Sequence, residues 1–494
     1  MDSFADVKEL DAKELLEQML AQDIVIAPWL SVGEDIQRMT AEQRKILQDA
    51  ANEMSRMGTD DDLQVPPFQF FITRGFARRA YEEILLSTAI YLSHMRLGAL
   101  VVTSEMILVA QRLVRDFLQT HGLNSLIRVY AIIISFENCQ ALAHYQRIPL
   151  DIFISGKWHR PWIEYSLEYE LEHCCAVGLF RCVSDETDTY VELTSAGYVV
   201  FEQVQSILHA TDYLRKRSQL IRISQFTYLD DYDTIFNALA PTAHEIRRDL
   251  IALSQIQPDM KVLELGCGTG ALTLEDGLYK AVGEHGQVIA TDPSPGMLSR
   301  AASKGRIFQA TNVEFIQASA EHLPFADNTF DAVIGSVFLH YTHIQEALRE
   351  IHRVAKPGAI FATLYPLRFS TQQGFFVEWF KPLLTHPAFK NNESSQLLPD
   401  ETTVPPLLEG LFQQAEVTTR LHPSYYGDVK KVVKFFIQVG NVFENVLLTL
   451  PWQAQHDLID SLIERGQVIA DRYGRDELIY QQPSQWIKAV VHKG

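Results

Sequence analysis

Cysteine is scarce in this sequence and forms no pattern. The 494 residues include five cysteines, Cys139, Cys174, Cys175, Cys182 and Cys267, with neither a CxxC pair nor an even, regularly spaced set. This excludes the disulfide framework of a small secreted domain and favours a reducing compartment, so we expect a cytoplasmic protein. His173 with Cys174, Cys175 and Cys182 suggests a metal site. Because adjacent cysteines on a helix point about 100° apart, we interpret them as small buried hydrophobic residues and expect no metal.

Long apolar runs and an export signal are also missing. The longest apolar region, residues 88–110, contains His94, Arg96 and Glu105. Polar groups in that number predict a buried helix and exclude a membrane span. The first twenty residues are acidic and amphipathic, whereas a signal peptide would be basic and then continuously apolar.

An excess of positive charge is absent as well. The chain has 43 Lys and Arg against 62 Asp and Glu, a formal charge of −19. Affinity for a phosphate backbone comes from lysine and arginine that displace counterions, so nucleic acid is not expected as the main partner. The 47% of hydrophobic residues can bury large cores, and the length predicts two or three domains.

Three regions of the chain differ in pattern. Residues 1–120 predict helices, because apolar residues recur three and four positions apart. Residues 121–234 predict helix, helix, short hairpin and helix, which is the order of a winged helix. From 235 to 494, strand-like segments alternate with helices, which predicts an α/β domain with a parallel, doubly wound sheet.

The segment "KVLELGCGTG", residues 261–270, ends a strand-like run in alternating glycines, Gly266, Gly268 and Gly270. This GxGxG spacing differs from the GxGxxG dinucleotide fingerprint, and no Lys-Ser/Thr pair follows it as in a P-loop. A second strand-like run ends at Asp292, 22 residues beyond the last glycine. A carboxylate at that place can accept hydrogen bonds from both hydroxyls of a ribose, which favours a ligand with a ribose over a glycine turn without a ligand.

With "IQASAEHLPFADNTFDAVIGSVFLHY" and "ALREIHRVAKPGAIF", this stretch resembles the class I S-adenosylmethionine-dependent methyltransferases of small molecules over about residues 228–367. The resemblance implies a Rossmann-like sheet of seven strands and S-adenosylmethionine as the cofactor. It assigns the methionine end to Glu264 and the backbone of Gly266, Cys267 and Gly268, the ribose to Asp292, the adenine face to Met297, and the adenine edge to Ala320 and Glu321. Gly270 and Ser336 complete the implied cofactor site. Ser319 stands where the family often has an aspartate, and its hydroxyl can still accept a hydrogen bond.

The last two strands of the sheet are expected at residues 415–423 and 484–493, with a helical insertion at about 427–475 between them. Insertions at this place commonly cover the substrate in this family, and this one is rich in phenylalanine. The resemblance therefore implies a small, apolar or aromatic methyl acceptor. The alternative is that these phenylalanines only form core.

His340 follows the fourth strand, at the edge of the sheet where ligands bind. It aligns with the histidine of the Leu-His-Asp-Trp motif that acts as base in the O-methyltransferases, which implies O-methylation with His340 as the catalytic base. Tyr341 and Thr342 replace the aspartate and the tryptophan of that motif. Packing or contact with the substrate is therefore the alternative role for His340.

In the second region, four residues match a Y-x-x-L-T-x-x-G pattern: Tyr190, Leu193, Thr194 and Gly197. The pattern resembles the winged-helix domain that precedes the catalytic domain of O-methyltransferases and makes a homodimer. Because winged-helix transcription regulators share it, a regulator with a ligand-sensing methyltransferase-like domain is the alternative. Glu164, Glu168 and Glu172 recur along the expected recognition helix, where phosphates would repel them, so the homodimer is favoured.

Overall fold

A computed structural model of the protein describes residues 9–26, 39–56, 74–97, 102–121, 123–156, 166–211, 213–368, 374–386, 389, 398–439, 443, 446–447 and 449–493. In these ranges no helix is both long and apolar enough to cross a membrane. The cytoplasmic location stays a prediction. The chain divides into two compact units, unit 1 with residues 1–224 and 447–457, and unit 2 with residues 225–446 and 458–494.

Unit 1 is mainly helical. Its helices are α1 (Glu9–Ala21), α3 (Ala41–Ser55), α4 (Arg74–Leu97), α5 (Ser104–His121), α6 (Leu123–Tyr145), α7 (Leu150–Ser155), α8 (Glu168–Ala176) and α9 (Ser195–Ala210), and α10 (Tyr213–Tyr228) crosses into unit 2. A capping box starts α3: the Thr40 hydroxyl accepts from the Gln43 N–H at 3.1 Å, and the Gln43 side chain accepts from the Thr40 N–H at 2.8 Å. Two N–H groups that the first turn leaves unpaired are thereby satisfied.

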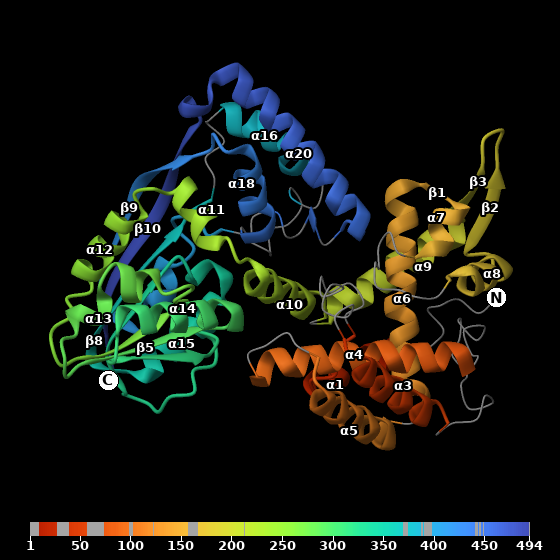
Figure 1. The fold of residues 1–494 in the computed structure, drawn as a ribbon, viewed down its shortest axis with the longest axis horizontal. Coiled ribbons are helices and arrows are strands. Elements are labelled where there is room, and N and C mark those ends of the chain that lie inside the picture. The colour runs from red at the N-terminus through yellow and green to blue at the C-terminus, as the bar shows by residue number, and fades with distance from the viewer. Residues whose placement is uncertain are drawn as a thin grey trace. The chain divides into compact units, whose positions relative to one another are not determined.

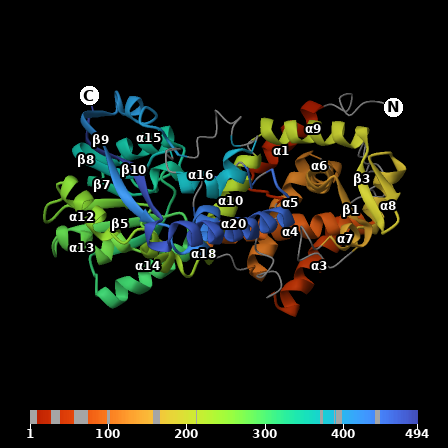
Figure 2. The ribbon, with the colours of Figure 1, turned by 90° about the horizontal axis from the view of Figure 1, so that it is seen from above.

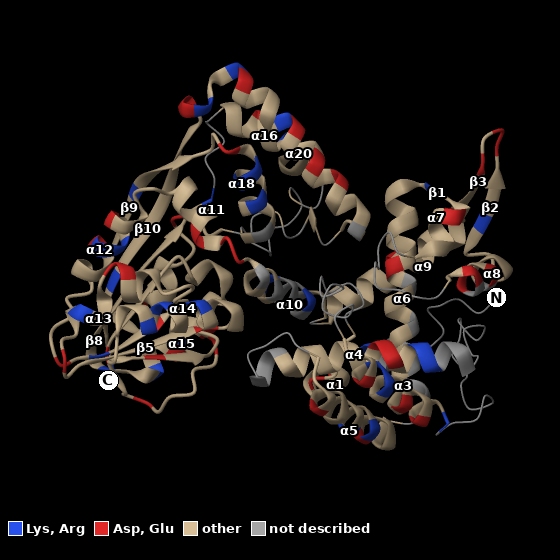
Figure 3. Ribbon diagram, viewed as in Figure 1, with Lys and Arg blue, Asp and Glu red and all other residues tan. Residues whose placement is uncertain are grey.

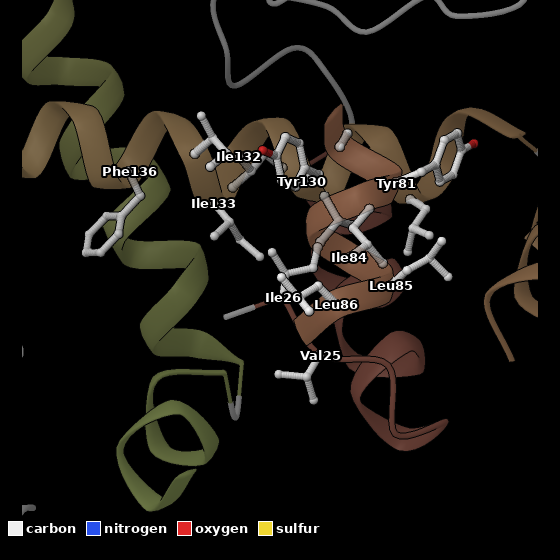
Figure 4. Close-up of a cluster of buried hydrophobic side chains, with 14 of the residues drawn as sticks. Val25, Ile26, Tyr81, Ile84, Leu85, Leu86, Tyr130, Ile132, Ile133 and Phe136 are labelled. Carbon is white, nitrogen blue, oxygen red and sulfur yellow. The ribbon is translucent and has the colours of Figure 1, made fainter. Parts of the chain in front are cut away.

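One hydrophobic core extends through both of the first two predicted regions. Figure 4 shows Ile84 and Leu86 of α4 gathered with Ile133 of α6 and with Ile26. The same cluster continues into β3 and α9 through Val191 and other buried residues. The structure therefore differs from the predicted domain limits. Among the described residues one core continues past residue 120, because α6 packs against helices on both sides of that point, and the first segment of unit 1 ends at residue 224 where 234 was predicted.

A small antiparallel sheet follows α6 in unit 1. Its strands β1 (Arg147–Pro149), β2 (Phe180–Ser184) and β3 (Thr189–Leu193) have the order β1-β3-β2, with α7 and α8 between the first two. Thr194 caps α9 by accepting from the Gly197 N–H at 3.1 Å, and a Cβ on Gly197 would meet the Leu179 carbonyl at 2.3 Å. Capping and close packing therefore explain the Thr and the Gly of the Y-x-x-L-T-x-x-G pattern. The winged-helix assignment itself stays a prediction.

The predicted acidic helix and cysteine cluster are only partly as expected. Glu164 lies outside the described residues, Glu168 and Glu172 of α8 are exposed, and Figure 3 shows the acidic colour on this helix.

Among the cysteines, Cys139, Cys174 and Cys267 are buried, Cys175 is half-buried, and Cys182 is exposed. Cys182 is therefore no buried hydrophobic residue. In the described part of the chain no three His, Cys, Asp or Glu side chains are grouped to hold a metal, and the His173 side chain lies outside that part.

Unit 2 is built on a seven-stranded, mostly parallel sheet, as predicted. The strands are β4 (Lys261–Leu265), β5 (Gln287–Asp292), β6 (Val313–Gln317), β7 (Phe330–Ser336), β8 (Ala355–Pro366), β9 (Phe412–Tyr425) and β10 (Ile479–Val491), in the order β6-β5-β4-β7-β8-β10-β9 (Figure 1). Only β10 runs antiparallel to its neighbours β8 and β9. The two last strands lie where the sequence predicts them and are longer than expected.

Helices cover both faces of this sheet: α11 (Tyr232–Leu239), α12 (Ala243–Leu253), α13 (Leu278–Ala281), α14 (Pro295–Phe308) and α15 (Ile344–Val354), with the short turns η4 (Ala271–Glu275) and η5 (Leu339–Tyr341). Figure 2 shows α12 and α13 on one side of the strands and α15 on the other. Leu250 of α12 belongs to the same buried cluster as Val262 and Trp486, whereas Ile351 of α15 belongs to the cluster that holds Leu263. Adjacent residues of β4 therefore enter different layers.

The sequence between β8 and the end of β10 adds a helical group to the sheet. It contains α16 (Gly374–Leu384), η6 (Pro405–Leu408), α18 (Val429–Lys434), η7 (Phe435–Val439), α20 (Trp452–Tyr473) and η9 (Arg475–Glu477). A Cβ on Gly466 of α20 would meet the Trp379 ring at 2.2 Å, so glycine allows these two helices to pack closely. Phe376, Phe380 and Phe436 form one aromatic cluster there.

Candidate active site

The carboxyl ends of three central strands bring the predicted cofactor residues together. Glu264 lies at the end of β4, Asp292 ends β5 and Ser336 ends β7, and β4 lies between the other two strands. The register pairs Glu264 with Ala290 and with Ile334. Since residues two apart in a strand face the same side, Glu264, Asp292 and Ser336 share one face of the sheet.

The loop after β4 requires its three glycines. Gly266, Gly268 and Gly270 have φ values of 64°, 55° and 85°, in the left-handed region where glycine has no steric cost. A Cβ on Gly266 would meet Cβ of Phe338 at 2.5 Å, whereas a Cβ on Gly268 would meet no described atom within 4 Å. Gly268 therefore presents bare backbone with space in front of it, which is the geometry that a close ligand needs.

Asp292 accepts hydrogen bonds from backbone N–H groups of the two loops that follow β4 and β5. Its two carboxylate oxygens accept from the Gly268 N–H at 2.9 Å and from the Ser294 N–H at 2.8 Å. Burial raises the pKa of Asp292 to about 6, although both backbone hydrogen bonds act to lower it. Each oxygen can accept a second hydrogen bond, so the carboxylate keeps capacity for ribose hydroxyls.

Glu264 is almost completely buried, with 1% of its surface exposed. The Thr273 hydroxyl donates to its carboxylate. Burial raises the pKa of Glu264 to about 8, against the opposing effects of the Thr273 hydrogen bond and the Arg247 charge. The Cys267 N–H donates to the Thr291 carbonyl at 2.9 Å, so buried Cys267 contributes backbone and packing at this place.

The residues assigned to adenine lie beyond β5 and β6. Met297 is buried in the first turn of α14, and Ala320 is buried in the loop after β6. The Ser319 hydroxyl donates to the Glu321 carboxylate, which also accepts from the His343 N–H at 2.8 Å. Because the Ser319 proton is used, its oxygen is left as an acceptor, which is the role expected for this position. Glu321 has in addition a structural role that the motif did not reveal.

Helix α11 is tied to the glycine loop through residues that the sequence analysis did not identify. Asp233 accepts from the Thr269 hydroxyl at 2.5 Å and from the Lys304 ammonium at 2.6 Å. Lys304 also contacts Glu275 at 2.5 Å. These contacts fix α11 and α14 around the loop. From the sequence, the spacing of apolar residues could indicate that α11 is a helix. It could not show that Asp233 contacts Thr269 and Lys304, because these partners are 36 and 71 positions away.

A strained turn after β7 positions His340. Val337 has a φ of 60°, which is rare for a β-branched residue, and its N–H donates to the Leu364 carbonyl at 2.8 Å. The Phe338 ring packs where a Cβ on Gly335 would lie, 2.5 Å from it. The positive φ of Val337 costs about 1–3 kcal/mol, and such a conformation persists only where the surrounding structure imposes it. The turn leads directly into η5, where His340 is 7% exposed.

A cavity of about 140 Å³ lies next to His340. It has room for roughly ten water-sized spheres of 10–15 Å³, which suits a group of metabolite size. Its aromatic walls are Phe236, Tyr341, Tyr426, Phe435 and Phe436, and its polar side chains are Arg247, Ser336, His340, His422, Ser424, Gln482 and Ser484. Phe435 and Phe436 belong to the predicted insertion, whereas Phe443 is buried against Phe380. The insertion therefore contributes to both the cavity and the core.

The strand register places this cavity on the cofactor face of the sheet. Ser336 pairs with Leu364, and Ser484 pairs with Pro366. His422 pairs with Gln482. Paired residues of neighbouring strands face the same side of the sheet, and so do residues two apart in one strand. The cavity residues Ser336, His422 and Ser484 therefore lie on the same face as Glu264. Ser336 therefore belongs both to the predicted cofactor site and to the wall of the cavity.

Arg247 of α12 was also missed by the sequence analysis. It lines the cavity, is 6% exposed, and pairs with the buried carboxylate of Asp276. Asp276 also accepts from the His244 ring at 2.7 Å. A single arginine within a helix belongs to no recognisable sequence motif. The position of Arg247 beside the cavity could therefore be found only from the structure.

The order of the seven strands, the glycine loop and the acidic residue at the end of the next strand define the class I methyltransferase fold. A family model described as "Methyltransferase domain" matches residues 262–358. A demethylmenaquinone methyltransferase of Bacillus cereus (strain B4264) is 32% identical over 196 residues, which are 38% of this chain and 82% of that protein. A demethylmenaquinone methyltransferase of Bacillus anthracis (strain CDC 684 / NRRL 3495) matches with the same identity and coverage.

The chain belongs to the S-adenosylmethionine-dependent methyltransferases, and S-adenosylmethionine is its cofactor. Among solved structures, a SAM dependent methyltransferase of Aquifex aeolicus has 25% sequence identity and covers 40% of this chain and 90% of its own, with a TM-score of 0.29. The fold assignment rests on the sheet order and the family match, not on that superposition. The bare backbone at Gly268 and the free acceptor sites of Asp292 fit the cofactor.

Binding of S-adenosylmethionine at pH 7 is expected to release protons. The cofactor brings a cationic sulfonium and an ammonium group, which favour the ionised form of a neighbouring carboxylate. With a pKa of about 8, Glu264 is largely protonated at pH 7 before binding, and it loses its proton as the pKa falls. Affinity therefore declines as the pH falls below about 8, and further near 6, the pKa of Asp292.

Calorimetry in two buffers of different ionisation enthalpy measures this release. The observed enthalpy should differ between phosphate and Tris for the wild type, and the difference should shrink in Glu264→Gln. Equal enthalpies in both buffers for the wild type would contradict the expectation.

Proposed function

We propose that this methyltransferase acts on a small, apolar or aromatic molecule held in the cavity beside His340. The observation that supports this most directly is Ser336, which belongs both to the cofactor face of β7 and to the cavity wall. An acceptor in the cavity would lie against the methyl donor, and five aromatic side chains would contact it. Holding two reactants at near-attack distance supplies much of the acceleration of a displacement.

The bound cofactor supplies an electrophilic methyl group on a sulfonium. Glu264 and Asp292 would hold its methionine and ribose parts, and the Gly268 backbone would allow close approach. Phe435 and Phe436 would exclude water from the acceptor. For a hydroxyl acceptor, His340 would take the proton as the new bond forms.

The choice of acceptor atom is part of this proposal. The relatives are named as demethylmenaquinone methyltransferases, so they act on a small molecule. By resemblance to the O-methyltransferases we propose a hydroxyl acceptor for this chain, with a quinone-like ring as a second class to test. The apolar cavity supports both choices, because either molecule offers a flat ring to its aromatic walls.

A labelled-methyl transfer assay tests the proposal. The full chain, S-adenosylmethionine with a labelled methyl group, and a panel of phenols, quinols and arylamines are incubated, and mass spectrometry locates the label. We expect label on one apolar aromatic class. Transfer only to small charged acceptors, or transfer unaffected by Phe436→Asp in the cavity wall, would contradict it.

We further propose that unit 1 serves homodimerisation and does not bind DNA. The turn between β2 and β3 contains Asp185, Glu186 and Asp188, and Figure 3 shows this tip in the acidic colour. Exposed Glu168 and Glu172 add to the negative charge of the neighbouring helix. Light scattering of the full chain should give twice the monomer mass. A monomer that binds duplex DNA at physiological salt would favour the regulator instead.

A further inference from the structure

His422 is held in one tautomer by a tryptophan of the neighbouring strand. The indole N–H of Trp486 donates to Nε2 of His422 at 3.2 Å. An indole nitrogen is a donor only, so Nε2 must be the acceptor and cannot carry a proton. The neutral ring therefore has its proton on Nδ1.

The surroundings keep this ring neutral. Burial and the charge of Arg420 lower the pKa of His422, with a smaller opposing effect of Asp249. The Arg420 guanidinium lies 4.1 Å from the centre of the Trp486 ring and pairs with Asp249 at 3.8 Å. Trp486 itself is 1% exposed, so protonation of His422 would leave a buried indole N–H without its acceptor.

The other nitrogen of His422 has no protein partner among the described residues. The hydrogen bond from Trp486 occupies Nε2, and His422 lines the same cavity as His340 and Ser336. The register places His422 and Trp486 on one face of β9 and β10, the face of the cofactor residues. A donor of fixed position therefore accompanies His340 in a cavity whose lining is mainly apolar.

We propose that His422 is a specificity residue whose Nδ1–H donates to an oxygen of the methyl acceptor, so that the preferred substrate is an aromatic ring with a carbonyl, ether or phenolate oxygen in addition to the atom that is methylated. This inference rests on the proposed use of the cavity as the acceptor site. It assigns different tasks to the two histidines. His422 cannot take a proton while Trp486 occupies Nε2, so it orients the ring and leaves proton removal to His340.

A matched pair of probes tests the donor without turnover. The binding of 1-tetralone, an aromatic ketone, is compared with that of tetralin, which lacks the oxygen, by calorimetry on the full chain with S-adenosylhomocysteine. One neutral hydrogen bond predicts about fivefold tighter binding of the ketone by the wild type. His422→Phe, which has no donor, should bind the two probes about equally, whereas His422→Gln keeps an amide N–H donor and should retain part of the preference. In the Gln variant a side-chain oxygen remains for Trp486, which protects the fold.

Ser424→Ala is the control, since Ser424 lines the same cavity two residues further along β9. This variant should keep the preference for the ketone. A preference that persists in His422→Phe, or is absent from the wild type, overturns the proposal. Because the assay involves no methyl transfer, it separates this result from a failure of the proposed reaction.

Nitrogen-15 NMR of histidine-labelled protein gives a second readout that a merely structural role would not move. The His422 signals, assigned by their loss in His422→Gln, should show a protonated Nδ1 and an unprotonated Nε2 at pH 7, and Nδ1 should shift when 1-tetralone is added but not with tetralin. A protonated Nε2, or equal shifts with both probes, overturns the proposal.

Discussion

Gly268→Val is expected to abolish measurable S-adenosylmethionine binding. The glycine has a φ of 55°, where a β-branched residue is strained, and its Cβ direction leads into the space before the loop. The valine side chain would occupy the place that the ligand needs for contact with the backbone. Loss of the loop conformation would also remove the N–H that Asp292 accepts at 2.9 Å.

Gly358→Val is the matched control for strain. Gly358 lies in β8 with a φ of 80°, is exposed, and also has no described atom within 4 Å of an added Cβ. Both variants should lose stability to a similar extent in thermal unfolding, by about 1–3 kcal/mol. Calorimetry should show near-normal cofactor affinity for Gly358→Val alone. Equal affinity in both variants would remove Gly268 from the cofactor site.

Asp292→Ala tests the same site from the ribose side, since it removes the acceptor of two backbone N–H groups, which is also the residue predicted to accept from the ribose. Its affinity for S-adenosylmethionine should also fall strongly.

The cofactor half of the site could be predicted from the sequence because its residues are local to strand ends. The glycines follow β4 directly, and Asp292 ends β5, so a parallel sheet necessarily brings them to one edge. The spacing of the glycines and the acidic residue at a strand end can be recognised directly in the sequence. The last two strands were also predicted at the right places, although both are longer than expected.

The lining of the cavity beside His340 could not be predicted, because its residues meet only through the fold. Arg247 and His422 are 175 positions apart and line one cavity. His422 has its tautomer fixed by Trp486 across two antiparallel strands, and neither residue forms a motif. The strained Val337 likewise reads as an ordinary apolar residue in the sequence.

Unit 1 shows the same limit for domain borders. Periodicity indicates where helices lie but not which of them share a core, and α6 contacts α1, α4 and α5 as well as α9. The change of sequence pattern near residue 120 therefore does not mark a domain boundary, because residues on both sides of it belong to one hydrophobic core.

His340→Ala is expected to lower turnover with a hydroxyl acceptor by about 10²–10⁴-fold, the usual contribution of a general base. The affinity for S-adenosylmethionine should stay nearly normal, because Glu264 and Asp292 lie on other strands. In the wild type, turnover should rise with pH in the range of about 5 to 8, where an imidazole loses its proton. Single-turnover rates with labelled cofactor measure both effects.

His340→Gln separates base catalysis from positioning. Glutamine keeps a polar group of similar reach, but it cannot accept a proton near neutral pH, so its turnover should fall nearly as far as that of the alanine variant and lose the rise with pH. Tyr341→Phe is the control for packing, because it removes only the hydroxyl that donates to the Val439 carbonyl at 2.6 Å beside the His340 ring. That variant should keep the pH profile. A Gln variant with near-normal turnover would mean that His340 only orients the acceptor, and the methylated atom would then be an amine nitrogen that is already neutral, or an activated carbon, neither of which requires a base at this place.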